Sequence, residues 1–243
     1  QAEVSQPTVI RFCRSLGFLG LADFKLKFAS SLTGSIPVRH SQVRGSDSTH
    51  DLSAKVIDNT ISAILQFRDQ LDVRAIDRAI ELVSRARRVE FYALGNSRVV
   101  ALDGQHKFFR FRIPTAIYGD SHLFKLAAEL LGPGDVVIAI SNSGRLPDLL
   151  AAVEAAREAG ADVIAICNSQ SPLARRADVL LAVDHAEDST HFLAMISRVL
   201  QLLLIDIMAV GISVDVHRAR ALPPAAAEGE GEGRRALISH LDS

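Results

Sequence analysis

Apolar positions between residues 51 and 218 alternate between two spacings. Apolar residues three or four positions apart predict helices at residues 52–67, 73–87, 98–111, 121–131, 146–159 and 191–210, with a short helical turn near residues 172–176. Between them, short and nearly continuous apolar runs predict strands at residues 89–94, 115–117, 135–140, 162–167 and 179–183. Runs such as VVIAI and DVIAIC are typical of parallel strands that are buried on both faces. The alternation therefore predicts an α/β fold with an open, doubly wound parallel sheet.

The two ends of the chain differ from this central region. Residues 1–32 predict two short helices, a partial all-α segment, and residues 33–50 are rich in Gly, Ser, Pro and His, which favours a linker. Residues 51–218 form the predicted α/β domain. Residues 219–243 contain Pro, Ala and alternating Glu and Gly, so we expect a tail without fixed structure. Because the chain does not begin with Met, we expect it to be part of a longer one.

Composition narrows the class of protein. The chain has 243 residues, 48% of them hydrophobic, and a formal net charge of −1, as expected for a globular protein with a buried core. The first 50 residues carry six basic and three acidic side chains, which hints at an anionic partner. Cys13 and Cys167 lie far apart in apolar contexts, which predicts reduced core cysteines of a cytoplasmic protein. Polar residues inside the apolar stretch 192–214 favour a buried helix over a membrane span.

Two loops of small polar residues follow predicted strands. Gly95, Asn96 and Ser97 come after the first strand, and Ser141, Asn142, Ser143 and Gly144 come after the third. Each loop precedes a helix, whose first N–H groups are unsatisfied and attract anions, while glycine lets the backbone approach a ligand closely. The loops therefore predict a phosphate site without a nucleotide P-loop motif. The alternative is that these Ser and Asn side chains only cap the helices.

These loops resemble a known domain. ALGNS and ISNSGR are similar to the phosphate-binding loops of the sugar isomerase (SIS) domain, a flavodoxin-like sandwich that binds phosphorylated sugars. The resemblance assigns phosphate binding to Ser97, Ser141 and Ser143, with Gly95 and Asn142 beside them. The sequence departs from the family pattern in two places. Ala93 replaces a glycine of the first loop, and Leu146 or Pro147 replaces a threonine of the second, so one phosphate donor is expected to be missing.

Further polar residues are weaker candidates for the ligand site. Asp103, Lys107 and Arg110 share one face of a predicted helix, where Lys107 or Arg110 could neutralise a sugar acid or simply belong to an ion-paired surface. Ser121 either caps its helix or contacts the ligand. Glu187 and His191 are candidates by residue type, since an isomerase needs a general base.

The amino-terminal stretch VSQPTVIRFCRSLGF predicts a helix that is capped by Ser5 and ends at Gly17. Val9, Phe12, Cys13 and Leu16 form its apolar stripe. Four polar side chains are predicted to point outward, namely Gln6, Thr8, Arg11 and Arg14. This pattern resembles the recognition helix of a helix-turn-helix, with Lys25 and Lys27 of the next helix available to the DNA backbone. The alternative is an ordinary pair of amphipathic helices.

The combined segments resemble the RpiR family of bacterial transcriptional regulators, of which the HexR and MurR types are nearest. HKFFR, GDSH, ISNSGR and SRVLQLLLIDIMAVGI carry the likeness over most of residues 4–214. The resemblance implies a regulator, not an enzyme, that binds a phosphorylated sugar or sugar acid of the 2-keto-3-deoxy-6-phosphogluconate type and forms a homodimer or tetramer. It implies no cofactor and no metal. N-acetylmuramate 6-phosphate and pentose phosphates remain open as ligands.

Few residues precede this predicted recognition helix. Only three come before Val4, so we expect operator DNA to be bound through the full-length parent and not through this chain alone. Two other functions remain open. One is an aldose-ketose sugar-phosphate isomerase with Glu187 or His191 as its base, and the other is a purely structural oligomerisation domain.

Overall fold

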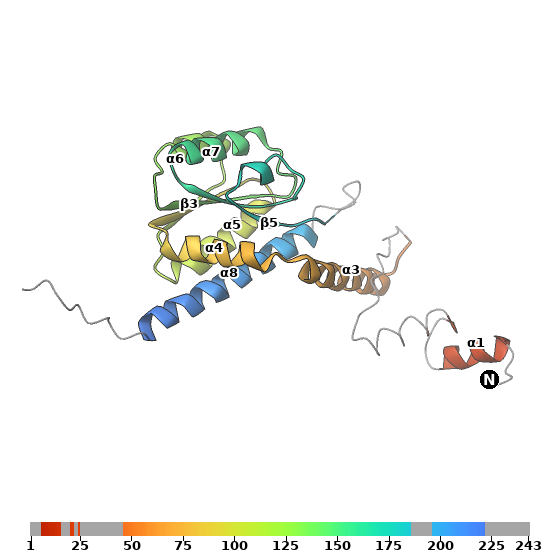
Figure 1. The fold of residues 1–243 in the computed structure, drawn as a ribbon. Coiled ribbons are helices and arrows are strands. Elements are labelled where there is room, and N and C mark those ends of the chain that lie inside the picture. The colour runs from red at the N-terminus through yellow and green to blue at the C-terminus, as the bar shows by residue number, and fades with distance from the viewer. Residues whose placement is uncertain (1–5, 16–19, 22–23, 25–45, 186–195, 222–243) are drawn as a thin grey trace, which may run out of the picture.

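The computed structural model describes residues 6–15, 20–21, 24, 46–185 and 196–221. A central sheet lies between two layers of helices, and the long helix α3 and the short helix α1 precede this three-layered domain (Figure 1). The fold is the predicted α/β arrangement, preceded by helical residues.

The sheet contains five parallel strands in the order β2-β1-β3-β4-β5. The strands are β1 (Arg88–Ala93), β2 (Thr115–Tyr118), β3 (Asp135–Ser141), β4 (Asp162–Cys167) and β5 (Val179–Ala182). Phe91 in β1 is level with Ile117 in β2 and with Ile138 in β3, which in turn is level with Ile164 in β4. The apolar runs predicted all five strands to within one residue at either end. The β-branched residues of β3 and β4 are buried on both sides of the sheet, whereas β2 is only partly buried.

Helices cover both faces of the sheet, as a doubly wound fold requires. On one face, α4 (Val73–Arg85), α5 (Ser97–Phe109) and α8 (Ile196–Ala221) pack against side chains such as Phe91 and Ile138. On the other, α6 (Ser121–Ala128) and α7 (Pro147–Glu158) pack against Tyr92 and Ala139. A 3-10 turn, η1 (Ala174–Arg176), occupies the position of the predicted short helix.

Helix α8 is longer than predicted. The prediction ended at residue 210, just before Gly211, yet the helix continues to Ala221. Gly211 is the point of close contact with α4, since a Cβ there would lie 2.3 Å from Cδ1 of Ile80. By length and apolar composition alone, residues 196–215 would suffice to cross a membrane. Leu204, Ile205 and Met208 pack in the core instead, which agrees with the predicted buried helix.

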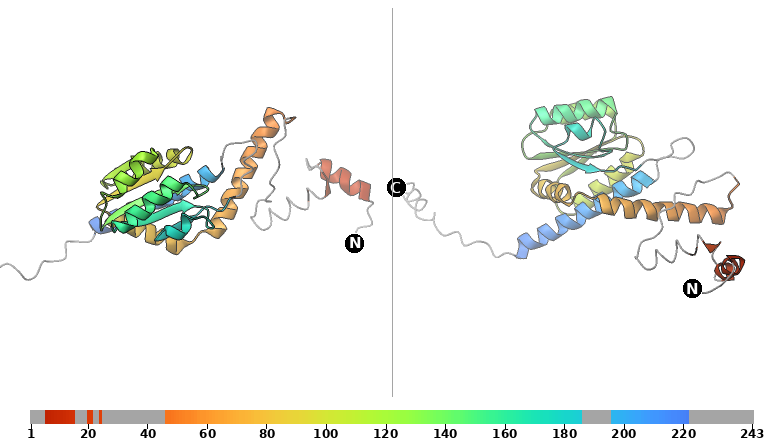
Figure 2. Two further views of the ribbon diagram at one scale, coloured as in Figure 1. Left: turned by 90° about the horizontal axis from the view of Figure 1, so that it is seen from above. Right: turned by 45° about the vertical axis from the view of Figure 1, so that its right-hand side comes forward.

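Helix α3 (Thr49–Gln70) begins three residues earlier and ends three residues later than predicted. Its start is set by a capping box in which Ser48 and Asp51 satisfy each other's backbone N–H groups. Thr49 and His50, which the sequence assigned to the linker, therefore belong to the helix. Figure 2 shows α3 extending away from the sheet, and it contacts the domain mainly through α8.

Helix α1 (Gln6–Ser15) lies within the predicted amino-terminal helix. Within the predicted apolar stripe, Cys13 is buried but Phe12 is 57% exposed. Adjacent positions on a helix point about 100° apart, and only one of these two neighbours faces inward. Both cysteines are free thiols in buried positions, as predicted.

Candidate functional site

The two serine loops meet at the point where the order of the strands in the sheet reverses. Strands β1 and β3 are neighbours, but the helix after β1 lies on one face of the sheet and the helix after β3 lies on the other. Ligands of open parallel sheets bind at such a switch point, beyond the carboxyl ends of the strands. Residues 95–97 (the first serine loop) and residues 141–144 (the second serine loop) are therefore side by side at this edge.

The first serine loop turns the chain from β1 into α5. Gly95 has a φ of 56°, in the left-handed region that glycine adopts without strain. Its carbonyl accepts a hydrogen bond from the Arg98 N–H at 3.1 Å. Ser97 is the first residue of α5 and only 9% exposed, and its hydroxyl has no partner among the described residues. The Ser97 hydroxyl is thus available to donate a hydrogen bond to a ligand.

The second serine loop is held by its own hydrogen bonds and by the next loop. Ser141, 4% exposed, accepts a hydrogen bond at Oγ from the Gly144 N–H at 3.1 Å, and Ser143 Oγ accepts from the Arg145 N–H at 3.4 Å. The Leu173 N–H donates to the Gly144 carbonyl at 3.1 Å. Gly144 has a φ of 58°, and a Cβ there would lie 2.3 Å from Ser171 Oγ. The backbone of this loop is therefore fixed before any ligand arrives.

Helix capping distinguishes the two helices that start at these loops. Side chains cap α3, α4 and α6, through Ser48, Asp72 and Asp120. The N-caps of α5 and α7 are Asn96 and Leu146, and neither side chain makes a capping hydrogen bond. Two helix N-termini at the switch point therefore retain unsatisfied N–H groups and partial positive charge. The simple capping alternative does not hold for Asn96.

Two arginines that sequence reasoning did not select border the loops. Arg98 follows Ser97, and its side chain lies along Gly119 after β2, where a Cβ would be 2.5 Å from Arg98 Nε. Arg145 follows Gly144 and is exposed. The exposed Asp148 lies in the first turn of α7 and partly offsets this positive charge. The signal for both arginines was their position directly after the loops.

The loop after β4 packs against the second serine loop and holds it in place. Ser171 Oγ donates to Cys167 Sγ at 3.3 Å and accepts from the Ala174 N–H at 3.1 Å. Burial raises the pKa of the Cys167 thiol to about 11, so it is a neutral structural thiol at physiological pH. Among the described residues, no group of His, Cys, Asp and Glu side chains could hold a metal ion.

Two of the weaker candidates, Lys107 and Arg110, lie at the far end of α5 from the loops. Lys107 is ten residues along α5 from Ser97, about 15 Å at the rise of an α-helix. Its Nζ contacts Asp103 at 2.6 Å and also Asp206 of α8. Burial would lower the pKa of Lys107, but its hydrogen bonds to both carboxylates raise it. Arg110 caps the distal end of the same helix. The ion-paired alternative therefore describes Lys107 better than a ligand contact.

The remaining candidates are divided between described and undescribed residues. Ser121 does not cap α6, because Asp120 accepts the hydrogen bond from the His122 N–H at 2.9 Å. Thr8, Arg11 and Arg14 are exposed on α1, as predicted, and Gln6 begins that helix. Ser5, Lys25, Glu187 and His191 lie outside the described residues.

Comparisons with known proteins agree with this arrangement. The SIS domain model matches residues 82–211, and the model "Helix-turn-helix domain, rpiR family" matches residues 1–35. The structure of the NanR protein of Vibrio vulnificus, complexed with ManNAc-6P, has the same fold with a TM-score of 0.65. It is 23% identical and covers 90% of this chain and 78% of its own.

Two curated relatives are closer in sequence. The bifunctional protein glk of Paraburkholderia xenovorans (strain LB400) is 56% identical over 93% of this chain, but the chain spans only 35% of that protein. The HTH-type transcriptional regulator HexR of Escherichia coli (strain K12) is 38% identical over 88% of this chain and 74% of its own length. The chain therefore belongs to the RpiR family of regulators, in which a helix-turn-helix segment precedes a SIS domain.

Proposed function

We propose that this chain is the sugar-phosphate-sensing part of a DNA-binding transcriptional regulator. The single observation that carries the ligand class is the pair of uncapped helix N-termini at the switch point. Both begin directly after loops of serine and glycine. A phosphate would accept hydrogen bonds from Ser97, Ser143 and the remaining free N–H groups of the two first turns. Pro147 has no N–H, and the Arg98 N–H already donates to Gly95. Leu146 has no hydroxyl, so the expected missing donor would be replaced by backbone N–H groups.

The ligand that we propose is a sugar acid phosphate of the 2-keto-3-deoxy-6-phosphogluconate type. Its phosphate would occupy the loops, and its carboxylate would pair with Arg98 or Arg145, because guanidinium groups bind carboxylates with two parallel hydrogen bonds. The relationship to HexR supports this ligand class. The NanR complex supports the ability of the fold to hold a phosphorylated sugar.

The DNA-binding role belongs to the amino-terminal segment. Arg11 and Arg14 are exposed on α1, where they would contact phosphates while Gln6 and Thr8 face base edges. We place the protein in the cytoplasm as a homodimer or tetramer, since a two-fold assembly matches paired operator half-sites. We also propose that the chain as a whole performs no catalysis. Any reaction of the bifunctional relative would belong to the part of that protein that this chain does not match.

A phosphorus NMR titration tests the proposal. A panel of sugar phosphates is added to the chain, and we expect one compound to shift or broaden without new signals over several hours. New product signals would instead identify the isomerase alternative.

Ser97→Ala tests the site itself. We expect a loss of affinity of roughly ten- to a hundredfold for that compound, because a hydrogen bond to a charged group contributes about 1.5–3 kcal/mol. Ser53→Ala, at an exposed position on α3, is the matched control. Lys107→Met should also leave the affinity unchanged, given its distance from Ser97. Equal affinity of Ser97→Ala and the unsubstituted chain would refute the phosphate site.

A further inference from the structure

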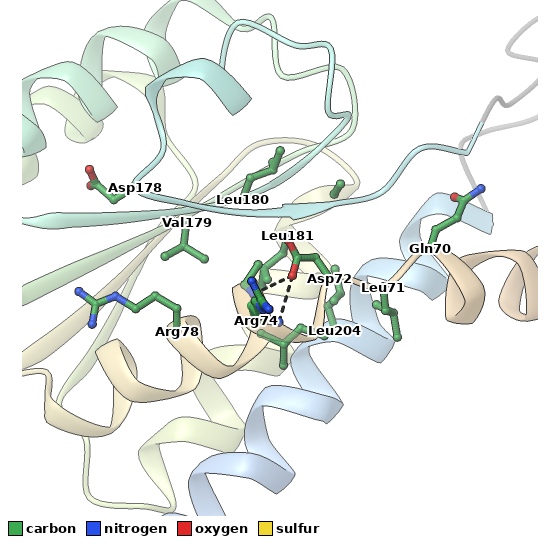
Figure 3. A pocket seen from close by; sticks show the side chains of 13 residues that line it. Gln70, Leu71, Asp72, Arg74, Arg78, Asp178, Val179, Leu180, Leu181 and Leu204 are labelled. Carbon is green, nitrogen blue, oxygen red and sulfur yellow. Dashed lines mark hydrogen bonds between the residues drawn. The ribbon is translucent and has the colours of Figure 1, made fainter.

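A groove of about 380 Å³ lies along the outer side of β5, the last strand of the sheet. It is bordered by β5 on one side and by the start of α4 on the other (Figure 3). Ile76, Val179, Leu181 and Leu204 give it an apolar floor. The groove lies on the opposite edge of the sheet from β2 and is separate from the serine loops.

The shape of the groove suits an extended peptide. Strand β5 pairs only with β4 in the described part of the chain. Its outward backbone N–H and C=O groups are therefore open to a further strand. An extended segment that adds to such an edge gains main-chain hydrogen bonds and places alternate side chains in the adjoining groove.

The charges of the groove favour an acidic segment. Its two carboxylates are already engaged, since Asp72 accepts from the N–H groups of Arg74 and Ala75 at 3.0 and 3.2 Å. Asp178 accepts from the Val163 N–H at 2.9 Å. Among the described residues, Arg74 has no ion pair, and the ion pair of Arg78 is with the half-buried Glu81, at 3.1 Å. Two guanidinium groups, one helical turn apart, therefore line the α4 side (Figure 3).

We infer that the groove binds the acidic tail segment of this same chain, residues 228–232. Glu228, Glu230 and Glu232 alternate with glycines there. In an extended strand these three side chains lie on one face at intervals of about 6.6 Å. Residues four apart on a helix, such as Arg74 and Arg78, are separated by about 6 Å along its axis. The two spacings match, so successive glutamates meet successive arginines.

The tail is long enough to reach the groove. Leu204 of α8 contacts the groove, and Ala221 ends that helix seventeen residues later, about 26 Å away along the helix axis. Nine extended residues, from Ala221 to Glu230, span at most about 32 Å. Glu230 and Glu232 can therefore return to Arg74 and Arg78 within one chain.

Hydrogen exchange of the full chain tests this inference. We expect the amides of β5 to exchange more slowly in the unsubstituted chain than in the variant E228Q/E230Q/E232Q. The difference is expected to be roughly two- to thirtyfold, the range that corresponds to two exposed ion pairs. High salt should remove it. Asp242→Asn, which removes an acid outside the Glu-Gly repeat, should exchange like the unsubstituted chain.

Charge reversal identifies the partners. In R74E/R78E, the β5 amides should exchange as fast as in E228Q/E230Q/E232Q. Combining R74E/R78E with E228K/E230K/E232K should restore their protection. Equal exchange of β5 in the unsubstituted chain and the triple variant would overturn the inference. Protection that rises with protein concentration would also overturn it, because the tail of a second copy would then occupy the groove.

Discussion

Two glycines with positive φ shape the serine loops in different ways. Gly95 has a φ of 56° and open space around its Cα, whereas Gly144 has a φ of 58° and the Ser171 side chain directly beside it. A side chain at either position meets backbone strain, but only at Gly144 does it also collide with a neighbour. A substitution at Gly95 therefore reports the cost of backbone strain alone, and one at Gly144 reports strain together with a steric clash.

Alanine substitutions measure this difference. Gly95→Ala should lower the free energy of unfolding by about 1–2 kcal/mol, the cost of a left-handed conformation with a Cβ. Gly144→Ala should cost more, because Ser171 or the loop must also move. Denaturant titration gives both values, and Gly132→Ala, with no positive φ and no neighbour within 4 Å, is the control. A smaller loss for Gly144→Ala than for Gly95→Ala would contradict the steric argument.

The position of the two serine loops could be predicted from the sequence, but the contacts of several other side chains could not. Gly, Ser and Asn after a buried strand follow a local pattern, so positions 95–97 and 141–144 could be found without coordinates. Two side chains have surroundings that the sequence alone did not specify. Lys107 pairs with Asp206, ninety-nine residues away, and Phe12 points outward although its neighbour Cys13 is buried. Such contacts depend on tertiary packing, which residue type and spacing do not specify.

At the scale of elements, β1 and β3 begin in a cluster of opposite charges. Asp135 is buried at the start of β3, where Arg87 binds it with two hydrogen bonds of 3.1 Å and the Gly132 N–H donates to it at 2.9 Å. Burial would raise the pKa of Asp135, but these partners and Arg88 lower it below its usual value. Glu90 in β1 behaves in the opposite way, since burial raises its pKa more than Tyr92 and Arg88 lower it.

The two carboxylates predict opposite dependences of stability on pH. Asp135 stabilises the fold fully above its unfolded pKa near 3.8, and this contribution is lost as pH falls through the lower folded pKa. Asp135→Asn should therefore lower the free energy of unfolding at pH 7 by about 2 kcal/mol and flatten the acid limb. Denaturant titrations between pH 3 and 7 measure this, with Asp162→Asn at the start of β4 as control.

Glu90 has the opposite sign of effect on stability. Its raised pKa contributes stability that is present below its usual value of 4.5 and lost as pH rises through the higher folded value. The same titrations should show that Glu90→Gln reduces the loss of stability as pH rises above 4.5. An unchanged profile for both variants would mean that the cluster does not control the pH dependence.

Helix boundaries were less predictable than strands. Asp120, and not Ser121, caps α6, and α8 continues through Gly211 to Ala221. A glycine ends a helix when its left-handed conformation is used, but at Gly211 it serves helix packing instead. The local sequence is compatible with both roles, and only the position of Ile80 on α4 distinguishes them.

At the scale of the whole molecule, α8 connects the sensing domain to α3. Helix α5, which begins at Ser97, packs against α8, and α8 packs against α3. Helix α3 follows the amino-terminal segment that carries Arg11 and Arg14. A change at the serine loops therefore has a packed route through α5 and α8 as far as α3.

DNA-binding measurements on the full-length parent protein test the role of α1. We expect R11A/R14A to weaken binding to a duplex and to reduce the slope of log affinity against log salt by about 1.8, which corresponds to two lost phosphate contacts. Fluorescence anisotropy from 50 to 200 mM salt measures the slope. Arg68→Ala, in an exposed ion pair on α3, is the control, and an unchanged slope for R11A/R14A would exclude phosphate contacts by these arginines.

The missing caps of α5 and α7 have a thermodynamic consequence. Helices α3, α4 and α6 carry side-chain oxygen acceptors at their N-termini, whereas no side chain caps α5 or α7. An effector that binds as proposed at these two N-termini would supply such acceptors, and its binding would stabilise the folded domain by about 2.7 kcal/mol at a hundredfold excess over Kd. The melting temperature is therefore itself a detector, and a collection of metabolites can be ranked by how far each one raises it.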